Sequence, residues 1–237
     1  MKRWWFRGIV IALIGSGLSM FRGQSTSTLS EYVSAECLGE RAAPTLVVYF
    51  HGIDSLEPSE HELRNRQVLQ KLANQHQLRI ALPRSDFRCP HDATLRCWMW
   101  SEWDEQLIRG RIDTAMQWAR DKCSPNQRVS GLIGFSNGGL LVNRVVQQCL
   151  SVERDWLISV GAPGSWQPSP ESLENCGRLT MLMGRADEGA RSSALELKEH
   201  LEARSAKVLW LDYDGGHSME TESLNHILSL MQSEMEN

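Results

Sequence analysis

Gly134-Phe135-Ser136-Asn137-Gly138 is the stretch that decides the fold of this 237-residue chain. It separates an apolar run that is typical of a strand, residues 129–135, from a run that is typical of a helix, residues 140–150. Glycine two residues before and after the serine permits the sharp strand-to-helix turn called a nucleophile elbow. Such a turn holds the hydroxyl of Ser136 at the end of the strand, with the N–H of Asn137 facing a developing oxyanion. The stretch therefore predicts a nucleophilic serine.

Apolar runs and amphipathic runs alternate on both sides of this turn. Short apolar runs predict further buried strands over residues 45–50, 78–83, 156–161, 179–183 and 207–211. Helical patterns predict helices from a capping box at Ser59 and Glu62 to about His76, from Ser101 to Pro125, over residues 192–204, and around Leu224 to Met235. The second of these places seven residues on one inner face: Trp103, Leu107, Ile108, Ile112, Ala115, Met116 and Ala119. This alternation predicts a compact α/β fold, with about six mainly parallel strands and helices on both faces.

Four features that can carry chemistry lie at the ends of predicted strands: His51-Gly52, Ser136, Asp187 and His217. Ligands of parallel sheets bind at the carboxyl ends of the strands, so these features are expected to meet at one edge. A serine hydroxyl is a weak nucleophile at neutral pH, and an imidazole must accept its proton during attack. A buried carboxylate then orients the imidazole and stabilises its charged form.

From residue 45 to the C-terminus, these motifs resemble the α/β-hydrolase family, whose triad follows the chain order Ser, acid, His. The resemblance implies that Ser136 is the nucleophile, Asp187 the acid and His217 the base. It also implies an oxyanion hole formed by the N–H groups of Asn137 and Ile53. His51 is expected to be structural.

Within that family, the chain looks like the branch that holds acyl-protein thioesterases, dienelactone hydrolases and exported feruloyl-esterase-like or polyhydroxybutyrate-depolymerase-like enzymes. The connection over residues 162–178 has no long apolar helix, so no large lid is expected. The short stretch before residue 45 implies that the family's first two strands are absent or vestigial.

Several residues have competing interpretations. Asp212 and Asp214 also lie near His217, but each has the alternative of being a solvated loop carboxylate or the start of a turn. Trp98, Trp100 and Trp166 either line an acyl or aryl pocket or simply cover the rim of the core. The five other histidines are expected to face solvent: His61, His76, His91, His200 and His226.

The N-terminus has the pattern of an export signal. Lys2, Arg3 and Arg7 precede 14 uncharged residues, a run too short for an ordinary membrane span, so residues 1–19 predict a cleaved signal peptide. An uncleaved signal anchor is the alternative. Residues 20–44 are expected to form a leader and short N-terminal segment, and residues 45–237 a single hydrolase domain. The mature protein is expected to be secreted or periplasmic, with no stable membrane span.

Charge and cysteine content narrow the partners. Without the three N-terminal basic residues, 22 of the 25 Lys and Arg remain against 29 Asp and Glu, which argues against a nucleic-acid partner. Six cysteines behind an export signal predict disulfides, with fifteen possible pairings. Cys89 with Cys97 is the most local pair, and Cys123 and Cys149 could also meet. The cysteine spacing makes a zinc site improbable, and no cofactor is expected.

Together these observations predict an exported serine hydrolase that cleaves a small-molecule carboxylic ester or thioester through an acyl-enzyme. A serine peptidase or amidase on the same fold is one alternative. A catalytically inactive hydrolase-like binding protein is another. The acyl and alcohol specificity and the oligomeric state are left open.

Overall fold

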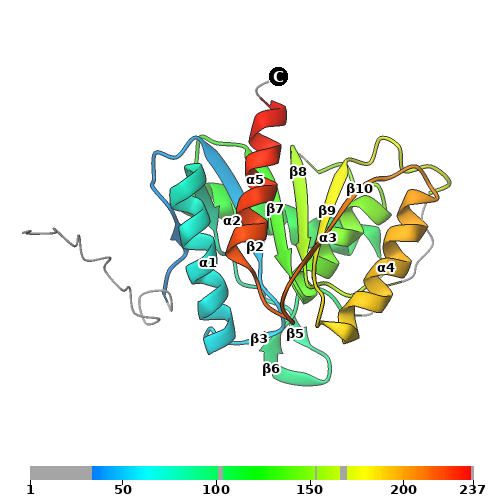
Figure 1. Ribbon diagram of the computed structural model, residues 1–237. Coiled ribbons are helices and arrows are strands. Elements are labelled where there is room, and N and C mark those ends of the chain that lie inside the picture. Colours follow the sequence, from blue (N-terminus) through cyan, green and yellow to red (C-terminus); the bar gives the residue numbers. More distant parts are fainter. Residues whose placement is uncertain (1–33, 101–103, 153, 166–169, 236–237) are drawn as a thin grey trace, which may run out of the picture.

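The computed structural model describes residues 34–100, 104–152, 154–165 and 170–235. A seven-stranded sheet has the order β1-β4-β2-β7-β8-β9-β10, and only β1 runs antiparallel to its neighbour (Figure 1). Its strands are β1 (Cys37–Leu38), β2 (Thr45–Phe50), β4 (Leu78–Ala81), β7 (Val129–Phe135), β8 (Trp156–Val160), β9 (Arg178–Gly184) and β10 (Lys207–Tyr213). The predicted α/β class and parallel sheet are confirmed, with one short edge strand more than the six expected.

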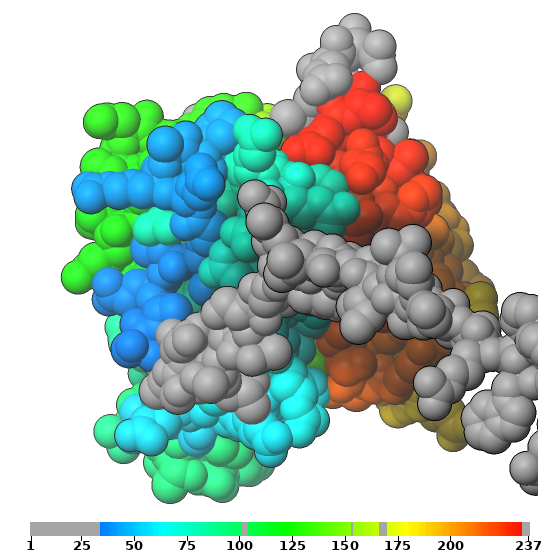
Figure 2. All heavy atoms as spheres, turned by 60° about the vertical axis from the view of Figure 1, so that its left-hand side comes forward, coloured from blue at the N-terminus to red at the C-terminus, as the bar shows by residue number. Residues whose placement is uncertain are grey.

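Helices cover both faces of the sheet, as predicted. They are α1 (Glu60–His76), α2 (Glu105–Cys123), α3 (Asn137–Gln147), α4 (Glu188–Glu202) and α5 (Thr221–Met235). One apolar core lies between the sheet and α2, α3 and α4, and a second lies between the opposite face and α1 and α5. The space-filling view shows α1 and the red α5 lying side by side over that second face (Figure 2).

The N-terminal cap of α1 is the residue predicted from the sequence, whereas that of α2 is a different residue. Ser59 caps α1 by accepting a hydrogen bond from the N–H of Glu62 at 3.2 Å, as the capping box predicted. Asp104 caps α2, so the prediction that this helix begins at Ser101 is wrong. Leu107 was expected to face the core but is 43% exposed, because the buried face of α2 begins at Ile108. Ser101 and Trp103 lie outside the described residues.

A small second sheet interrupts the region that was expected to be a plain loop, residues 84–100. It consists of β3 (Asp54–Ser55), β6 (Asp92–Arg96) and β5 (Arg88–Cys89) in that order, all antiparallel. It lies beyond the carboxyl ends of the main strands, at the bottom of Figure 1. Its strands are short and largely exposed, and therefore lack the apolar runs by which buried strands are recognised.

Three disulfides join the six cysteines: Cys89–Cys97, Cys37–Cys123 and Cys149–Cys176. The first was predicted, but the suggested meeting of Cys123 with Cys149 is wrong. Cys123 ends α2 beside the edge strand β1, while Cys149 follows α3 and reaches the turn before β9. β1 lies within residues 20–44, so the leader predicted there gives way to the sheet at Cys37.

The predicted signal peptide, residues 1–19, lies outside the described residues. Within the part of the chain that the structure describes, no helix has the length and apolar character needed to cross a membrane.

Two of the histidines that were expected to face solvent are buried. His76 is 7% exposed and His200 is 8% exposed. The ring of His76 lies 2.9 Å from Gln232 Oε1 and 2.6 Å from Asn225 Oδ1, so it ties the end of α1 to α5. Its position at the helix end gave no sequence signal for this partner, because α5 is about 150 residues further along the chain.

His51 is almost completely buried just after β2, at 1% exposure. Its Nδ1–H donates to the carbonyl of Gly52 at 2.6 Å, and its Nε2 accepts the N–H of Ser85 at 3.3 Å. Both bonds require a neutral ring that carries its proton on Nδ1. Burial lowers the pKa of His51 to about 4. The structural role expected for this residue agrees with these contacts.

The buried His51 should make the fold acid-sensitive. The unfolded chain binds a proton at this histidine near pH ~6.5, whereas the folded chain binds it only near pH 4. The unfolded state therefore holds more protons between these values, and the free energy of unfolding should fall by about 3 kcal/mol as the pH drops through this window. Urea unfolding at about pH 7 and about pH 4 should show this loss in the wild type and not in His51→Asn. An equal loss in both proteins would contradict the prediction, and the exposed His91→Asn is the matched control.

Candidate active site

Ser136 occupies a strained turn between β7 and α3. Its backbone has φ 51° and ψ −112°, a conformation that costs a non-glycine residue about 1–3 kcal/mol. A Cβ on Gly134 would lie 2.3 Å from the carbonyl oxygen of Gly138, and one on Gly138 would lie 2.0 Å from that of Phe50. Only glycine fits at either position. The N–H of Ser136 donates to the carbonyl of Val160 at 2.8 Å, which fixes the turn against β8.

Three side chains that are far apart in the sequence meet at this turn. Nε2 of His217 lies 2.9 Å from Oγ of Ser136, and Nδ1 of His217 lies 2.7 Å from Oδ2 of Asp187. The carboxylate of Asp187 is 10% exposed and the imidazole of His217 is 40% exposed. When Nδ1–H donates to the carboxylate, Nε2 is left as an acceptor for the hydroxyl proton of Ser136. The arrangement is chemically suited to activating that hydroxyl.

The loop after β10 carries His217 into place by crossing close to the end of β9. A Cβ on Gly184 would lie 2.4 Å from the carbonyl oxygen of Gly216. The N–H of Ala186 donates to the carbonyl of Gly215 at 2.8 Å, and the hydroxyl of Tyr213 donates to that of Gly216, also at 2.8 Å. These contacts hold the two strand ends together, so Asp187 and His217 keep a fixed distance.

The two other carboxylates near His217 have different partners. Asp212 forms an ion pair with Arg191 at 3.1 Å and accepts the indole N–H of Trp210 at 3.1 Å. Asp214 pairs with Arg185 at 2.5 Å on the surface. Of the three carboxylates compared in the sequence, the structure therefore places Asp187 against His217.

Both predicted oxyanion donors lie in segments that adjoin Ser136. Asn137 begins α3, where the N–H groups of the first turn have no partner within the helix and favour an anion. Ile53 follows Gly52, and a Cβ on Gly52 would lie 3.4 Å from Cβ of Ser136. Within the described part of the chain, neither N–H donates a hydrogen bond. Their role as donors stays a prediction.

His61 is exposed, as the sequence suggested, and it also lies next to these groups. Its ring centroid is 5.2 Å from that of Phe135 and 6.4 Å from that of His217. Burial lowers the pKa of His61, and the neighbouring His217 lowers it further. With Gly52 and Ile53 it lines a shallow cavity of about 30 Å³. A lone histidine in the first turn of a helix carries no sequence signal of such a neighbour.

The three predicted substrate-binding tryptophans are placed differently. Trp98 is 4% exposed and packs edge-on against Phe50, with ring centroids 4.9 Å apart. Trp100 is partly exposed and packs against His91 at 4.7 Å. Trp166 lies outside the described residues. A substrate contact by any of them stays a prediction.

Among the described residues, no group of three His, Cys, Asp or Glu side chains is arranged so that it could bind a metal ion.

Solved structures with the same fold include those of three proteins. Arabidopsis thaliana SOBER1 is 17% identical, with a TM-score of 0.57 over 81% of this chain and 99% of that one. A Bacillus cereus carboxylesterase is 13% identical, with a TM-score of 0.59 over 83% and 92%. A Mesorhizobium loti carboxylesterase is 16% identical, with a TM-score of 0.58 over 81% and 90%. These similarities establish the α/β-hydrolase fold.

Sequence comparison identifies the family. No curated protein is significantly similar to the chain. The family model described as serine hydrolase (FSH1) matches residues 47–223, which include Ser136, Asp187 and His217. Because this match covers most of the sequence, the chain belongs to the serine hydrolase (FSH1) family.

Proposed function

We propose that the protein hydrolyses a carboxylic ester or thioester through an acyl-enzyme, with Ser136 as nucleophile, His217 as general base and Asp187 as the acid that orients it. The observation that carries the proposal is the unbroken hydrogen-bonded line from Ser136 Oγ through His217 to Asp187, at 2.9 Å and 2.7 Å. It lies on a strained turn whose conformation costs free energy and is expected mainly at functional positions.

In the proposed reaction, Oγ of Ser136 attacks the ester carbonyl carbon while its proton passes to Nε2 of His217. The carbonyl π electrons move onto oxygen, and the N–H groups of Asn137 and Ile53 bind the oxyanion. Collapse of this intermediate breaks the bond to the leaving group, which takes the proton from His217. Water then attacks the carbonyl carbon of the acyl-enzyme while His217 accepts its proton. Collapse of this second intermediate returns the proton to Oγ of Ser136 and releases the carboxylic acid. Asp187 stabilises the imidazolium in both halves.

The geometry of the site and the proteins that share its fold both support ester or thioester cleavage. Two of the proteins that share this fold are carboxylesterases. The described parts of the connection after β8, residues 161–165 and 170–177, contain no helix that could act as a lid. The imidazole of His217 is 40% exposed, so the site is open to a substrate from solution.

Ser136→Ala should abolish hydrolysis of p-nitrophenyl esters and labelling by a fluorophosphonate, because it removes the attacking oxygen. Triad deletions cost on the order of 10⁶-fold in kcat. Ser130→Ala is a matched control on the same strand, about 20 Å away at its amino end. Labelling that persists in Ser136→Ala, or an unlabelled wild type that is inert towards esters and thioesters, would refute the proposal. Faster cleavage of peptide anilides than of esters would indicate a peptidase or amidase instead.

Asp187→Asn should lower kcat by roughly 10³- to 10⁴-fold and leave KM nearly unchanged, because the amide favours the wrong tautomer of His217. The measurement is steady-state hydrolysis of the best ester of the panel. Asp214→Asn alters an exposed carboxylate paired with Arg185 and should change kcat by less than about twofold. Similar losses in both variants would show that Asp187 has no special role.

We also propose that the protein is exported and works outside the reducing cytoplasm. Three disulfides within the described residues support this location, since such bonds persist in oxidising compartments. The sequence pattern of residues 1–19 supports it as well.

Expression in a bacterial host should yield a periplasmic or secreted protein that begins at residue 20 and has no reactive thiol. Intact-mass analysis and thiol titration measure both properties. Replacement of Lys2, Arg3 and Arg7 by Glu should retain the chain in the cytoplasm, because the positive start of the signal is lost. A wild-type product that keeps Met1 and stays in the cytosol would contradict export.

A further inference from the structure

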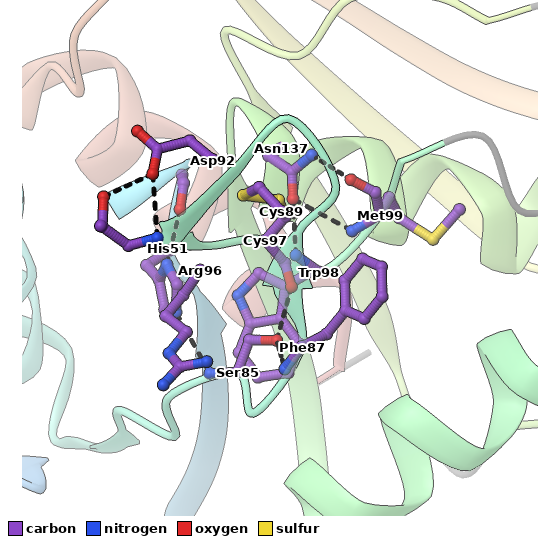
Figure 3. Close-up of a disulfide and its surroundings, with 12 residues drawn as sticks. His51, Ser85, Phe87, Cys89, Asp92, Arg96, Cys97, Trp98, Met99 and Asn137 are labelled. Carbon is purple, nitrogen blue, oxygen red and sulfur yellow. Dashed lines mark hydrogen bonds between the residues drawn. A yellow bond between two sulfur atoms is a disulfide. The ribbon is translucent and has the colours of Figure 1, made fainter. Parts of the chain in front are cut away.

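Both predicted oxyanion donors are attached to the same piece of chain, residues 85–99, here called the brace. The brace contains β5, β6 and the disulfide Cys89–Cys97 (Figure 3). One donor residue, Ile53, is linked to it through His51. The other, Asn137, contacts it directly. Neither link was visible in the sequence, where this region was expected to be a loop.

The first link runs through the ring of His51. Its Nε2 accepts the N–H of Ser85 at 3.3 Å, and its Nδ1–H donates to the carbonyl of Gly52 at 2.6 Å. That carbonyl belongs to the peptide that carries the N–H of Ile53. In a trans peptide the C=O and the N–H point in opposite directions, and the structure contains no cis peptide among the described residues. Fixing the carbonyl of Gly52 towards His51 therefore turns the N–H of Ile53 the other way.

The second link is made by the side chain of Asn137. Its Oδ1 accepts the N–H groups of Trp98 at 2.6 Å and Met99 at 3.1 Å, and its Nδ2 donates to the carbonyl of Met99 at 2.7 Å. The residue is only 8% exposed, and Figure 3 shows its side chain pointing at residues 98 and 99. Three bonds to one amide fix the rotation of Asn137 and, with it, the position of its own backbone N–H.

The brace is cross-linked between these two attachment points. The hydroxyl of Ser85 donates to the carbonyl of Cys97 at 2.5 Å and accepts the N–H of Phe87 at 3.1 Å. The N–H of Cys97 donates to the carbonyl of Phe87 at 3.1 Å, beside the Cys89–Cys97 disulfide. The first attachment point, Ser85, is thus bonded to Cys97, which immediately precedes the second, so the two cannot shift independently.

We propose that the brace is a positioning element that orients both N–H donors of the oxyanion hole, through His51 on one side and Asn137 on the other. The proposal rests on the proposed function, since it assumes that these N–H groups bind a reaction oxyanion. It adds His51 and Ser85 as positioning residues and gives the Cys89–Cys97 disulfide a part in activity beyond stability.

Two substitutions of His51 separate its two hydrogen bonds. In His51→Asn the amide Nδ2 takes the place of Nδ1 and can still donate to Gly52, whereas in His51→Gln the longer side chain keeps an acceptor for Ser85 but loses the donor to Gly52. Each variant breaks one of the two bonds that link the brace to the carbonyl of Gly52, so we expect kcat to fall roughly 10- to 100-fold in both, with KM within about threefold. A kcat close to that of the wild type in either variant, at a temperature where that variant is folded, would overturn the proposal.

A trifluoromethyl ketone gives a readout that simple destabilisation would not change. Ser136 Oγ adds to its carbonyl carbon, the hydroxyl proton moves to His217, and the resulting oxyanion occupies the hole. Its inhibition constant should therefore weaken across the His51 variants in proportion to the fall in kcat/KM. An unchanged inhibition constant in a variant with low kcat/KM would count against misplaced donors.

The disulfide is tested with two matched double variants. Cys89→Ala/Cys97→Ala opens the brace, while Cys149→Ala/Cys176→Ala opens a disulfide at the far end of α3, roughly 16 Å of helix from Ser136. Both should lower Tm. Only the first should lower kcat, by about tenfold or more, because small displacements of catalytic groups are costly. Equal kcat in the two folded proteins would refute the role of the disulfide. A wild type that resists fluorophosphonate and hydrolyses no ester would instead refute the proposed function itself.

Discussion

The backbone of Ser136, held at φ 51°, is the constraint on which the rest of the site depends. A serine pays for this conformation in free energy, so its surroundings must enforce it. They do so by exclusion: Gly134 and Gly138 sit against backbone atoms at distances where no side chain fits. The hydroxyl is consequently presented at the sheet edge, the one place where a loop from β10 and a carboxylate from β9 can both reach it.

The parallel strands bring the other residues of the site to Ser136. β7, β9 and β10 all end at the same edge, and the loops that follow them carry Ser136, Asp187 and His217. The loop after β2 is the fourth loop at this edge, and it places Gly52 next to Ser136. The small sheet then lies over this edge and contacts two of the four loops. The proposed catalytic side chains and the proposed oxyanion donors are therefore held by different parts of the molecule, the former by the main sheet and the latter by the brace.

Most of the main sheet could be predicted because buried parallel strands are apolar on both faces. β2 and β7 coincide with predicted runs for this reason. The glycine pattern located Ser136, and the chain order of the family that the sequence resembles indicated Asp187 and His217 as its partners. β5 and β6 could not be recognised, since their exposed residues follow no apolar period. Disulfide pairing depends on the third dimension, as Cys37–Cys123 demonstrates with a separation of 86 residues. The position of His61 beside the site was not predicted, because its neighbours Phe135 and His217 are far from it in the sequence.

The two lateral edges of the main sheet differ in how much hydrogen-bonding backbone they offer. On one side β1 provides only two residues, and the Cys37–Cys123 bond fastens it to the end of α2. On the other side β10 presents seven residues that are mostly half-buried. Short edge strands are a means by which natural sheets resist joining one another. Of the two edge strands described, only β10 is long enough to pair with the sheet of a second copy. Pairing between sheet edges would therefore stop at two molecules, because continued growth of the sheet needs a second long edge strand.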